Sequence, residues 1–359
     1  MVGERARGLS AGPSEKAALT ADIDRSSEPS ALPESGQGPT GWLPFIRKPI
    51  VGWPAALAAL IVLVAFWDIA RKSLVIGVVS DAPLVLAAIG FALLYRLTGL
   101  INVAYSETIT MGAYIGMWVN TTFGLNFYVT LIPTAIITGL YSVLTYFAIF
   151  RPAKLRNVGV VETIIISFGL SVFIRYGLQF IFGFEFRYYN VPVPRGISVL
   201  GVGVSPFRLT ALGVTLALSL LLIWFIARSR TGIRIRALAG DEKLAQVSGI
   251  NPLATTVLIW FLAGVAGGLA GAFYGVNTSC RAWLGWDQFL FVLLVVLIGG
   301  YWGISGVLVA GLATGFVLSF LELVPGLQTT PIYAQVILIA LFMVILKVRG
   351  NRLLEAGKV

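Results

Sequence analysis

The chain has 359 residues, of which 57% are hydrophobic and 12% are charged, and its formal net charge is +10. Soluble domains carry about 25% charged residues, so this composition excludes a soluble globular protein and predicts an integral membrane protein. The basic residues stand singly or in small groups beside apolar stretches, which is typical of membrane loops rather than of a nucleic-acid-binding surface. Histidine is absent, which removes the commonest metal ligand, and the single cysteine, Cys280, allows no internal disulfide.

The first 45 residues differ in composition from the rest of the chain. They are rich in Ser, Pro, Gly and Ala and show no apolar period. Such a segment cannot bury enough apolar surface to fold, so residues 1–45 are predicted to be a disordered N-terminal tail. They lack the apolar core that a signal peptide needs behind its basic start. We place the membrane domain at residues 46–350 and a C-terminal tail at residues 351–359.

Apolar stretches dominate from Trp53 onward, and a stretch of about 20 such residues is long enough to cross a bilayer. They predict an all-α integral membrane protein, a polytopic helical bundle of roughly 8 to 10 spans. Glycines four residues apart, such as Gly264 with Gly268 and Gly267 with Gly271, predict close helix packing. The candidate spans are residues 53–70, 80–98, 103–123, 128–150, 158–182, 208–227, 253–276, 287–300, 303–322 and 331–347.

Two of these stretches have polar or glycine-rich interruptions, at residues 98–108 and 299–306. Interrupted helices are tolerated in a membrane where protein or water satisfies the backbone, and they point to discontinuous or re-entrant segments along a transport path. Capping of a helix end is the alternative role for Glu107. The predicted substrate-path residues are Asn102, Tyr105, Ser106, Glu107 and Thr108.

Two further ionisable residues, Glu162 and Arg175, lie in the apolar stretch 158–182. Charge within a membrane is expensive and often functional. Their separation along the chain prevents pairing within one helix, and we expect structural roles for both. The aromatic residues of the loops are expected to anchor the membrane interface; they are Tyr188, Tyr189, Trp283 and Trp286.

The longest polar segment, residues 228–251, contains a short helical pattern. Asp241 is its predicted N-cap and Gly249 its predicted C′ residue, which leaves about two helical turns between them. Leu244 and Val247 are three residues apart and therefore share one face. A short amphipathic helix between membrane spans is too small to be a domain, so the segment is predicted to dock onto a partner.

Basic clusters predict the orientation of the spans. The clusters are separated by even numbers of apolar stretches, which places them and both termini on the cytoplasmic side. Arg71 and Lys72 favour the opposite orientation, and residues 183–207 are predicted to form an outside loop. The cytoplasmic clusters are Arg47 with Lys48, residues 151–156, residues 228–243 and residues 347–352.

Catalytic and nucleotide-binding motifs are missing from the sequence. It has no G-x-x-x-x-G-K-[ST] phosphate loop, no H-E-x-x-H and no G-x-S-x-G. We therefore expect no catalytic residue, no metal site and no enzyme activity in this chain.

Residues 83–114 resemble the opening segment of the branched-chain amino-acid ABC transporter permeases of the LivH type. Residues 236–251 are similar to the family's cytoplasmic loop, which ends in Leu/Val-x-Gly-Ile-Asn. The chain departs from the family at Tyr105-Ser106, where His-Gly is usual, and at residues 301–305, where Gly-Ser-x-Pro is usual. The shared pattern G-x-I-N-x-A-x-x-E-x-x-x-x-G-A/S-Y falls on Gly99, Ile101, Asn102, Ala104, Glu107, Gly112, Ala113 and Tyr114.

The resemblance implies a multi-pass permease subunit of an ATP-driven importer for branched-chain amino acids in the bacterial cytoplasmic (inner) membrane. Its implied partners are a second related permease or an identical copy, two cytoplasmic ABC ATPases, and an extracytoplasmic substrate-binding protein. ATP would bind to the ATPases, and this chain would carry no cofactor. The residues implied to couple the permease to an ATPase are Arg236, Asp241, Leu244, Ala245, Val247, Gly249 and Ile250.

Other functions remain open from the sequence. Urea and short amides are alternative substrates, because related permeases also handle them. An ion-coupled secondary transporter could use Glu107 and Glu162 as proton carriers, and an intramembrane enzyme is a third class. The segment 228–251 favours the ABC permease, since a secondary carrier has no ATPase to dock.

Overall fold

The computed structural model describes residues 67–99, 101–192, 195–300 and 303–323, with a few more residues between 336 and 344. The predicted tails 1–45 and 351–359 lie outside these residues, as do most of the candidate spans 53–70 and 331–347. The regular secondary structure of the described residues is helical apart from one two-stranded hairpin and an isolated β-bridge, which confirms the predicted fold class.

Most of the long helices follow the predicted apolar stretches, with breaks at the predicted interruptions, but α3 extends through residues 71–79, which the sequence placed between two spans. The helical structure is interrupted between α4 and α5, and again between α13 and α14. The hairpin strands are β1 (Ile197–Val199) and β2 (Val202–Val204). The helices are α3 (Trp67–Ser80), α4 (Ala82–Thr98), α5 (Tyr105–Phe123), α6 (Phe127–Thr145), the π-helix η1 (Tyr146–Phe150), α7 (Arg151–Leu155), α8 (Val160–Phe182), α9 (Pro206–Arg228), α10 (Arg230–Gly240), α11 (Glu242–Val247), α12 (Pro252–Asn277), α13 (Leu284–Gly299) and α14 (Gly303–Leu323).

Not every described helix is a full membrane span. Five are long and apolar enough to cross a membrane, or six if α3 and α4, which meet at a bend of 51°, count as one. α13 has 16 residues and is shorter than a span. α5 has 19 residues but carries Glu107, Asn120 and several threonines, so it suits a position shielded by other helices.

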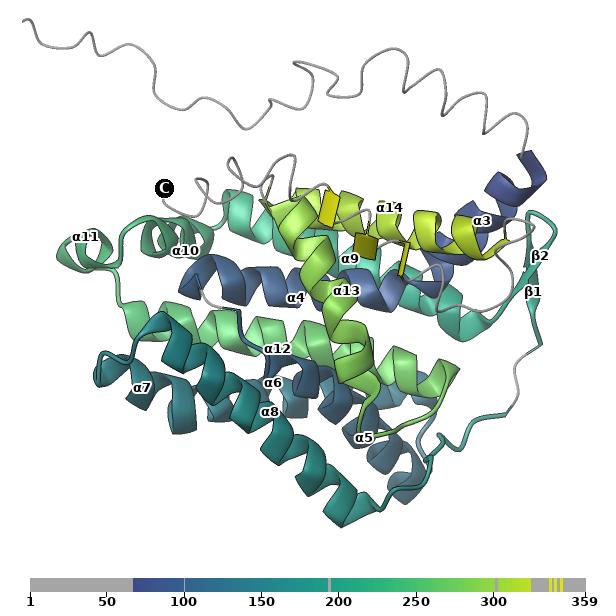
Figure 1. Cartoon of the computed structure of the whole chain (residues 1–359), viewed down its shortest axis with the longest axis horizontal. Helices are drawn as coiled ribbons and strands as arrows, with labels where there is room; N and C mark the ends of the chain where they lie inside the picture. The colour runs from purple at the N-terminus through teal and green to yellow at the C-terminus, as the bar shows by residue number, and fades with distance from the viewer. Residues whose placement is uncertain are drawn as a thin grey trace, which may run out of the picture. The chain divides into compact units, whose positions relative to one another are not determined.

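Two helices form the centre of the bundle (Figure 1). α4 is buried on every side from Ala82 to Leu94, which is the position expected for a helix that is hydrophobic all round. α12 contacts α4, α5 and α6. These two helices are the scaffold against which α5 is held.

Glycine allows α12 to approach its neighbours closely. A Cβ atom at Gly271 would overlap the carbonyl oxygen of Ile109 on α5, and a Cβ atom at Gly112 would overlap the backbone of Gly268. On the other side, a Cβ atom at Gly264 would overlap α6. These contacts confirm the close packing that the glycine spacing predicts.

The polar segments gather at two opposite ends of the bundle (Figure 1). α7, α10 and α11 lie at one end, here called the basic end, where Lys154 of α7 forms a 2.6 Å ion pair with Glu242 of α11. The predicted shared side of clusters 151–156 and 228–243 is therefore confirmed. The β1–β2 hairpin lies at the other end, here called the hairpin end.

The position of α3 at the hairpin end explains why Arg71 and Lys72 favour the orientation opposite to that of the other basic clusters. Arg71 and Lys72 belong to α3, which packs Val75 and Val79 against Val204 of β2. They therefore lie on a helix associated with the hairpin end, away from the basic clusters of α7 and α10.

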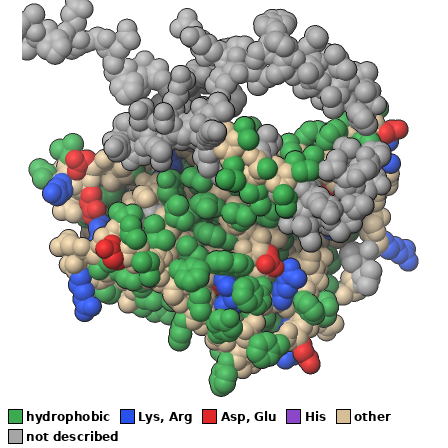
Figure 2. All heavy atoms as spheres, viewed as in Figure 1, with side chains coloured by type: hydrophobic (Ala, Val, Ile, Leu, Met, Phe, Trp, Pro, Cys, Tyr) green, Lys and Arg blue, Asp and Glu red, His purple; other side chains and the backbone are tan. Residues whose placement is uncertain are grey.

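The outer helices are apolar outside and polar inside. On α6, Ile132 and Leu140 are exposed, whereas Thr134 and Thr138 are fully buried and donate hydrogen bonds to carbonyls one turn back. Figure 2 shows hydrophobic side chains over much of the visible face, with charged side chains near its edges and in a small group toward the bottom. Such a surface is suited to hydrocarbon, where backbone and polar groups must be satisfied internally.

Candidate functional site

One face of α8 is polar along the whole length of the helix. The buried members of this face oppose exposed apolar residues such as Phe173 on the other side. Because residues four apart share a helix face, α8 presents a continuous polar strip, here called the α8 polar face, toward α5. Its members are Thr163, Ser167, Ser171, Arg175 and Gln179.

Arg175 and Glu107 form an ion pair at the centre of this interface. Arg175 Nη2 donates to Glu107 Oε1 at 2.6 Å, and Arg175 Nε donates to the same oxygen at 3.2 Å. Ser171 Oγ also donates to Oε1, at 2.8 Å. The arginine side chain is 4% exposed and the glutamate side chain 0%. Burial of a charge is tolerated when it is paired and hydrogen-bonded, and this pair meets both conditions.

Two tryptophans cover the guanidinium of Arg175. The ring centroids of Trp283 and Trp286 lie 4.5 Å and 4.4 Å from its Cζ atom. A cation over an indole face is attracted by the electron density of the ring. The sequence predicts that this aromatic pair anchors the membrane interface; the structure adds the contact with Arg175, which brings the start of α13 into the site.

Two buried oxygens at the start of α5, beside α8, have no hydrogen-bond partner among the residues that the structure describes. They are Glu107 Oε2 and Asn102 Oδ1. Most buried polar atoms are hydrogen-bonded, and an unmatched one calls for a specific explanation. An unmatched acceptor beside a buried ion pair is a place where a hydrogen-bond donor of a passing solute can bind.

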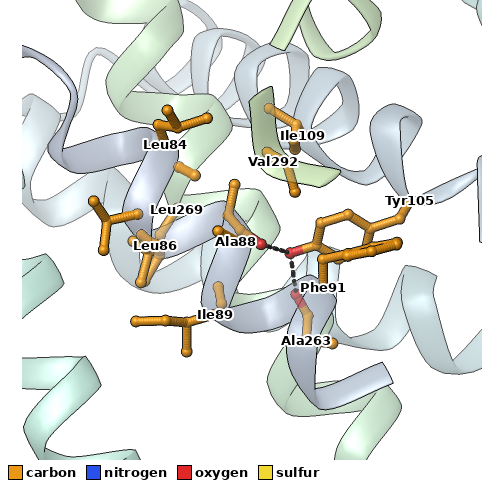
Figure 3. Close-up of a cluster of buried hydrophobic side chains, with 14 of the residues drawn as sticks. Leu84, Leu86, Ala88, Ile89, Phe91, Tyr105, Ile109, Ala263, Leu269 and Val292 are labelled. Atoms are coloured by element: carbon orange, nitrogen blue, oxygen red, sulfur yellow. Dashed lines mark hydrogen bonds between the residues drawn. The ribbon is translucent and has the colours of Figure 1, made fainter. Parts of the chain in front are cut away.

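The predicted substrate-path residues do not all face α8. Ser106 and Glu107 do, and Ser106 Oγ lies 3.4 Å from Ser171 Oγ. Tyr105 points toward α4 and α12, where its hydroxyl donates to Ala87 O at 2.9 Å within the apolar cluster of Figure 3. Neighbouring residues of a helix point about 100° apart, so a contiguous run cannot line one path.

Of the remaining two path residues, one faces α12 and the other faces α8. Thr108 packs against Gly267 of α12. Asn102 lies in the turn before α5 and lines a small cavity together with Thr163 and Ser167 of α8. Asn102 thus belongs with the α8 polar face, and Thr108 belongs with the α12 scaffold.

The structure joins residues that the sequence treats separately. Glu107 and Arg175 are 68 positions apart in the sequence. A structural role was expected for Arg175, and the structure adds a direct bond to Glu107, a candidate path residue. No side-chain cap bond forms at the start of α5, so the capping role for Glu107 lacks support. Glu162 is exposed on the first turn of α8 and lies outside the polar face.

Ser171 and Arg175 are partners of Glu107 that the sequence did not reveal. The four-residue spacing of polar residues from Thr163 to Gln179 is the signal that could have found them. In the described ranges, no group of three or more acidic or cysteine side chains is placed to hold a metal ion.

The predicted docking helix forms as α11, and both of its caps are confirmed. Asp241 accepts a hydrogen bond from Leu244 N at 3.0 Å. Gly249 adopts a φ of +81°, and the N–H groups of Gly249 and Ile250 donate to Gln246 O and Ala245 O. This pair of bonds is the Schellman arrangement, which needs a left-handed residue at C′.

α11 presents apolar side chains to the outside of the chain. Leu244 is 66% exposed and Val247 is 87% exposed, whereas Ala245 is buried. Arg236 on α10 donates to the carbonyl oxygen of Ile226 at the end of α9. The seven predicted coupling residues thus lie on a compact α10–α11 unit at the basic end (Figure 1).

Several curated permease proteins are similar to this chain in sequence. The chain is 27% identical over 305 residues to the high-affinity branched-chain amino acid transport system permease protein LivH of Salmonella typhimurium, covering 79% of this chain and 94% of that protein. It is 27% identical over 305 residues to BraD of Pseudomonas aeruginosa, a permease protein of the same description, covering 80% and 96%. It is also 28% identical over 295 residues to the nucleoside ABC transporter permease protein NupC of Lactococcus lactis, covering 74% and 90%.

No solved structure matches the chain. The family described as "Branched-chain amino acid transport system / permease component" matches residues 73–346. This range includes the α8 polar face, the Glu107–Arg175 pair and the α10–α11 unit. The chain therefore belongs to the branched-chain amino acid transport system permease family.

Proposed function

We propose that this chain is a permease subunit of an ATP-driven importer for branched-chain amino acids in the bacterial cytoplasmic membrane. The observation that carries the proposal is the α8 polar face with the buried Glu107–Arg175 pair at its centre, in a member of an ABC permease family. Intramembrane charges that face the interior of a bundle mark the route of a polar solute. The solute route proposed here runs between α5 and α8.

The ion pair suits a zwitterion chemically. A free amino acid carries a carboxylate and an ammonium group, which are the partners that Arg175 and Glu107 would take if they separated. Glu107 Oε2 has no partner among the described residues and can accept from the ammonium. Arg175 can offer its guanidinium to the carboxylate, because arginine binds carboxylates through several donors at once. The two charges of the solute would then pair with Glu107 and Arg175 in place of their contact with each other. No buried charge would be left unpaired.

The α10–α11 unit is proposed to couple this route to ATP hydrolysis on a partner. Leu244 and Val247 are exposed apolar side chains on a rigidly capped helix, which suits insertion into a groove of another protein. Ile235 of α10 is buried in the hydrophobic core of the bundle, and α10 contacts α9 and α4, so a displacement of α11 would be carried to these helices. The proposal places the basic end in the cytoplasm.

The remaining partners follow from the same proposal. A second related permease or an identical copy would complete the transmembrane unit, two ABC ATPases would bind at the basic end, and a substrate-binding protein would deliver solute at the hairpin end. ATP would bind to the ATPases and not to this chain.

The direct test is uptake of radiolabelled leucine by proteoliposomes that contain the complete transporter. We expect ATP-dependent, saturable uptake that isoleucine and valine inhibit. Uptake of another solute with no competition by these amino acids would overturn the substrate assignment.

Nucleosides are the second candidate, because the relative NupC is a nucleoside ABC transporter permease protein. A nucleoside has neither an ammonium nor a carboxylate, so it would leave the Glu107–Arg175 pair without charged partners. Urea and short amides are uncharged as well and would leave the pair in the same condition. Adenosine, uridine and urea as competitors in the same uptake assay separate these cases from the amino-acid assignment.

Gly249→Arg tests the docking role of α11. A side chain at a φ of +81° is strained, and a bulky cation beside Val247 would block a groove. We expect leucine uptake and ATPase stimulation to be lost while the protein stays in the membrane. Gly249→Ala, which keeps the strained backbone position but adds only a methyl group in open space, is the matched control and should retain transport. Normal coupling in Gly249→Arg would refute the docking role.

A further inference from the structure

A cavity of about 380 Å³ opens beside the α8 polar face, at the end of α8 that is remote from α7. Its walls come from α5, from the end of α8 with the residues that follow it, and from the segment 281–287. The cavity lies in the size range of small-molecule sites, which are mostly apolar with a few placed polar groups.

Aromatic side chains form much of the wall. They are contributed by Tyr114 of α5, by Phe184 and Phe186 after α8, and by Trp283 before α13. Tyr114 is buried, and its ring lies 4.7 Å from that of Phe182 between centroids. Rings held in this way give an apolar surface for a branched aliphatic side chain.

The polar groups of the cavity carry both signs of charge. Arg281 Nη2 lies 2.9 Å from Asp287 Oδ2, and the two side chains are 49% and 40% exposed. Gln179, the last member of the α8 polar face, also lines the cavity. Its Oε1 atom is buried and has no hydrogen-bond partner among the described residues. A paired cation and anion beside an unmatched acceptor can hold a carboxylate and an ammonium together.

Trp283 is shared between this cavity and the buried ion pair. It lines the cavity, and its ring also lies against the guanidinium of Arg175. The indole therefore contacts both the cavity, which carries the exposed Arg281–Asp287 pair, and the buried Glu107–Arg175 pair.

We infer that this cavity is an outer binding site for a small zwitterion with an apolar side chain, and that Trp283 separates it from the Glu107–Arg175 pair. In this site Arg281 binds the carboxylate, Asp287 and Gln179 Oε1 accept from the ammonium, and the aromatic wall contacts the side chain. The inference rests on the proposed function, because it takes the hairpin end to be the side from which solute enters.

Protection of a cysteine from labelling tests the site in the full-length chain. Phe186 is 56% exposed on the cavity wall, so Phe186→Cys should react with a membrane-impermeant maleimide in right-side-out vesicles. Native Cys280 is buried, and burial raises the pKa of its thiol to about 12, so it should add little background. Ile197→Cys, in the exposed hairpin strand, is the control that solute should not protect.

Leucine should slow the labelling of Phe186→Cys in a saturable manner and leave Ile197→Cys unchanged. Leucinol lacks the carboxylate and 4-methylpentanoate lacks the ammonium, so neither should protect at the same concentration. In the Phe186→Cys background, Arg281→Gln or Asp287→Asn should raise the leucine concentration needed by about tenfold, the effect of one lost charge-assisted hydrogen bond.

Equal protection by leucinol, or full protection by leucine in both charge variants, would overturn the inference. Absence of protection in vesicles that still take up leucine would overturn it too, while leaving the proposed function standing. Protection without leucine uptake by the complete transporter would support the site and count against the proposed function.

Discussion

Helix α5 is held differently on its two sides. Toward α12 the contacts are close and apolar: Gly271 lies directly against the backbone of Ile109, and Tyr105 is packed among apolar side chains. Toward α8 the contacts are hydrogen bonds and the Glu107–Arg175 ion pair. Close packing loses energy with any displacement, whereas polar bonds can be exchanged for equivalent bonds to a solute. The α12 side is therefore suited to be a fixed scaffold and the α8 side to be a movable wall.

The glycines of α8 support the same contrast. A Cβ atom at Gly169 or Gly177 would meet no atom within 4 Å, whereas every glycine of α12 would meet a neighbour. Of the 18 most apolar consecutive residues of each helix, only 22% are buried in α8, compared with 61% in α12. Few contacts and low burial are the features of segments that move at low cost.

The largest effect should come from breaking the ion pair on the α8 side. Glu107→Leu leaves the arginine buried and unpaired, and removal of one partner of a buried pair costs about 3–5 kcal/mol. We expect a lower melting temperature of the detergent-solubilised protein and loss of leucine uptake. Thermal melts and uptake assays measure the two effects separately.

The double variant Glu107→Leu/Arg175→Leu is the control. Replacement of both charges by apolar groups is often neutral for stability, so most of the lost thermal stability should return while uptake stays absent. If uptake returned together with stability, the pair would have a structural role and the proposed route between α5 and α8 would be wrong.

A smaller effect is expected from a single added methyl group on the α12 side. Gly271→Ala forces a Cβ atom into the backbone of Ile109, and such overpacking costs about 1–3 kcal/mol. Gly169→Ala on α8 is the matched control at an open position, where alanine favours the helix more than glycine does. Thermal melts should show destabilisation for the first variant and none for the second. Equal melting temperatures would remove the contrast between the two sides.

The sequence predicts local features of this molecule well. The caps of α11 could be predicted because Asp241 and Gly249 act on backbone groups within a few residues of themselves. The close packing of α12 could be predicted from its glycine spacing, although the spacing does not say which helix is the partner. The pattern from Gly99 to Tyr114 was enough to identify the permease family.

Long-range pairing could not be predicted in the same way. Arg175 meets Glu107 only because α5 and α8 are brought together by the folding of the helices between them. The predicted path residues included the consecutive residues 105–108 and therefore Tyr105, since proximity in sequence does not give the direction of a side chain on a helix. The bend at Asp81 was not predicted either, although Pro83 lies in the first turn of α4 and Gly77 in the last turn of α3, where both residues are usual near a helix boundary.

The smallest effect concerns reactivity rather than stability, and it compares two buried positions on opposite sides of α5. Cys280 Sγ donates to Ala113 O at 3.4 Å on the scaffold side, and Ser171 is fully buried on the α8 side. A thiolate is the reactive form of cysteine, and burial raises the pKa of Cys280 to about 12. Cys280 should therefore stay unreactive toward a small methanethiosulfonate at neutral pH, with labelling rising only as pH approaches the raised pKa.

Ser171→Cys should behave differently if α8 moves during transport. At rest it should be as slow as Cys280, because both positions are buried. During ATP-driven leucine uptake the α8 wall would open, and Ser171→Cys should be labelled several times faster while Cys280 stays unchanged. Mass spectrometry of the labelled chain, with and without ATP, distinguishes the two sites by their peptides. Faster labelling of Cys280 under turnover would mean that the α12 side moves as well, and α5 would then have no fixed face.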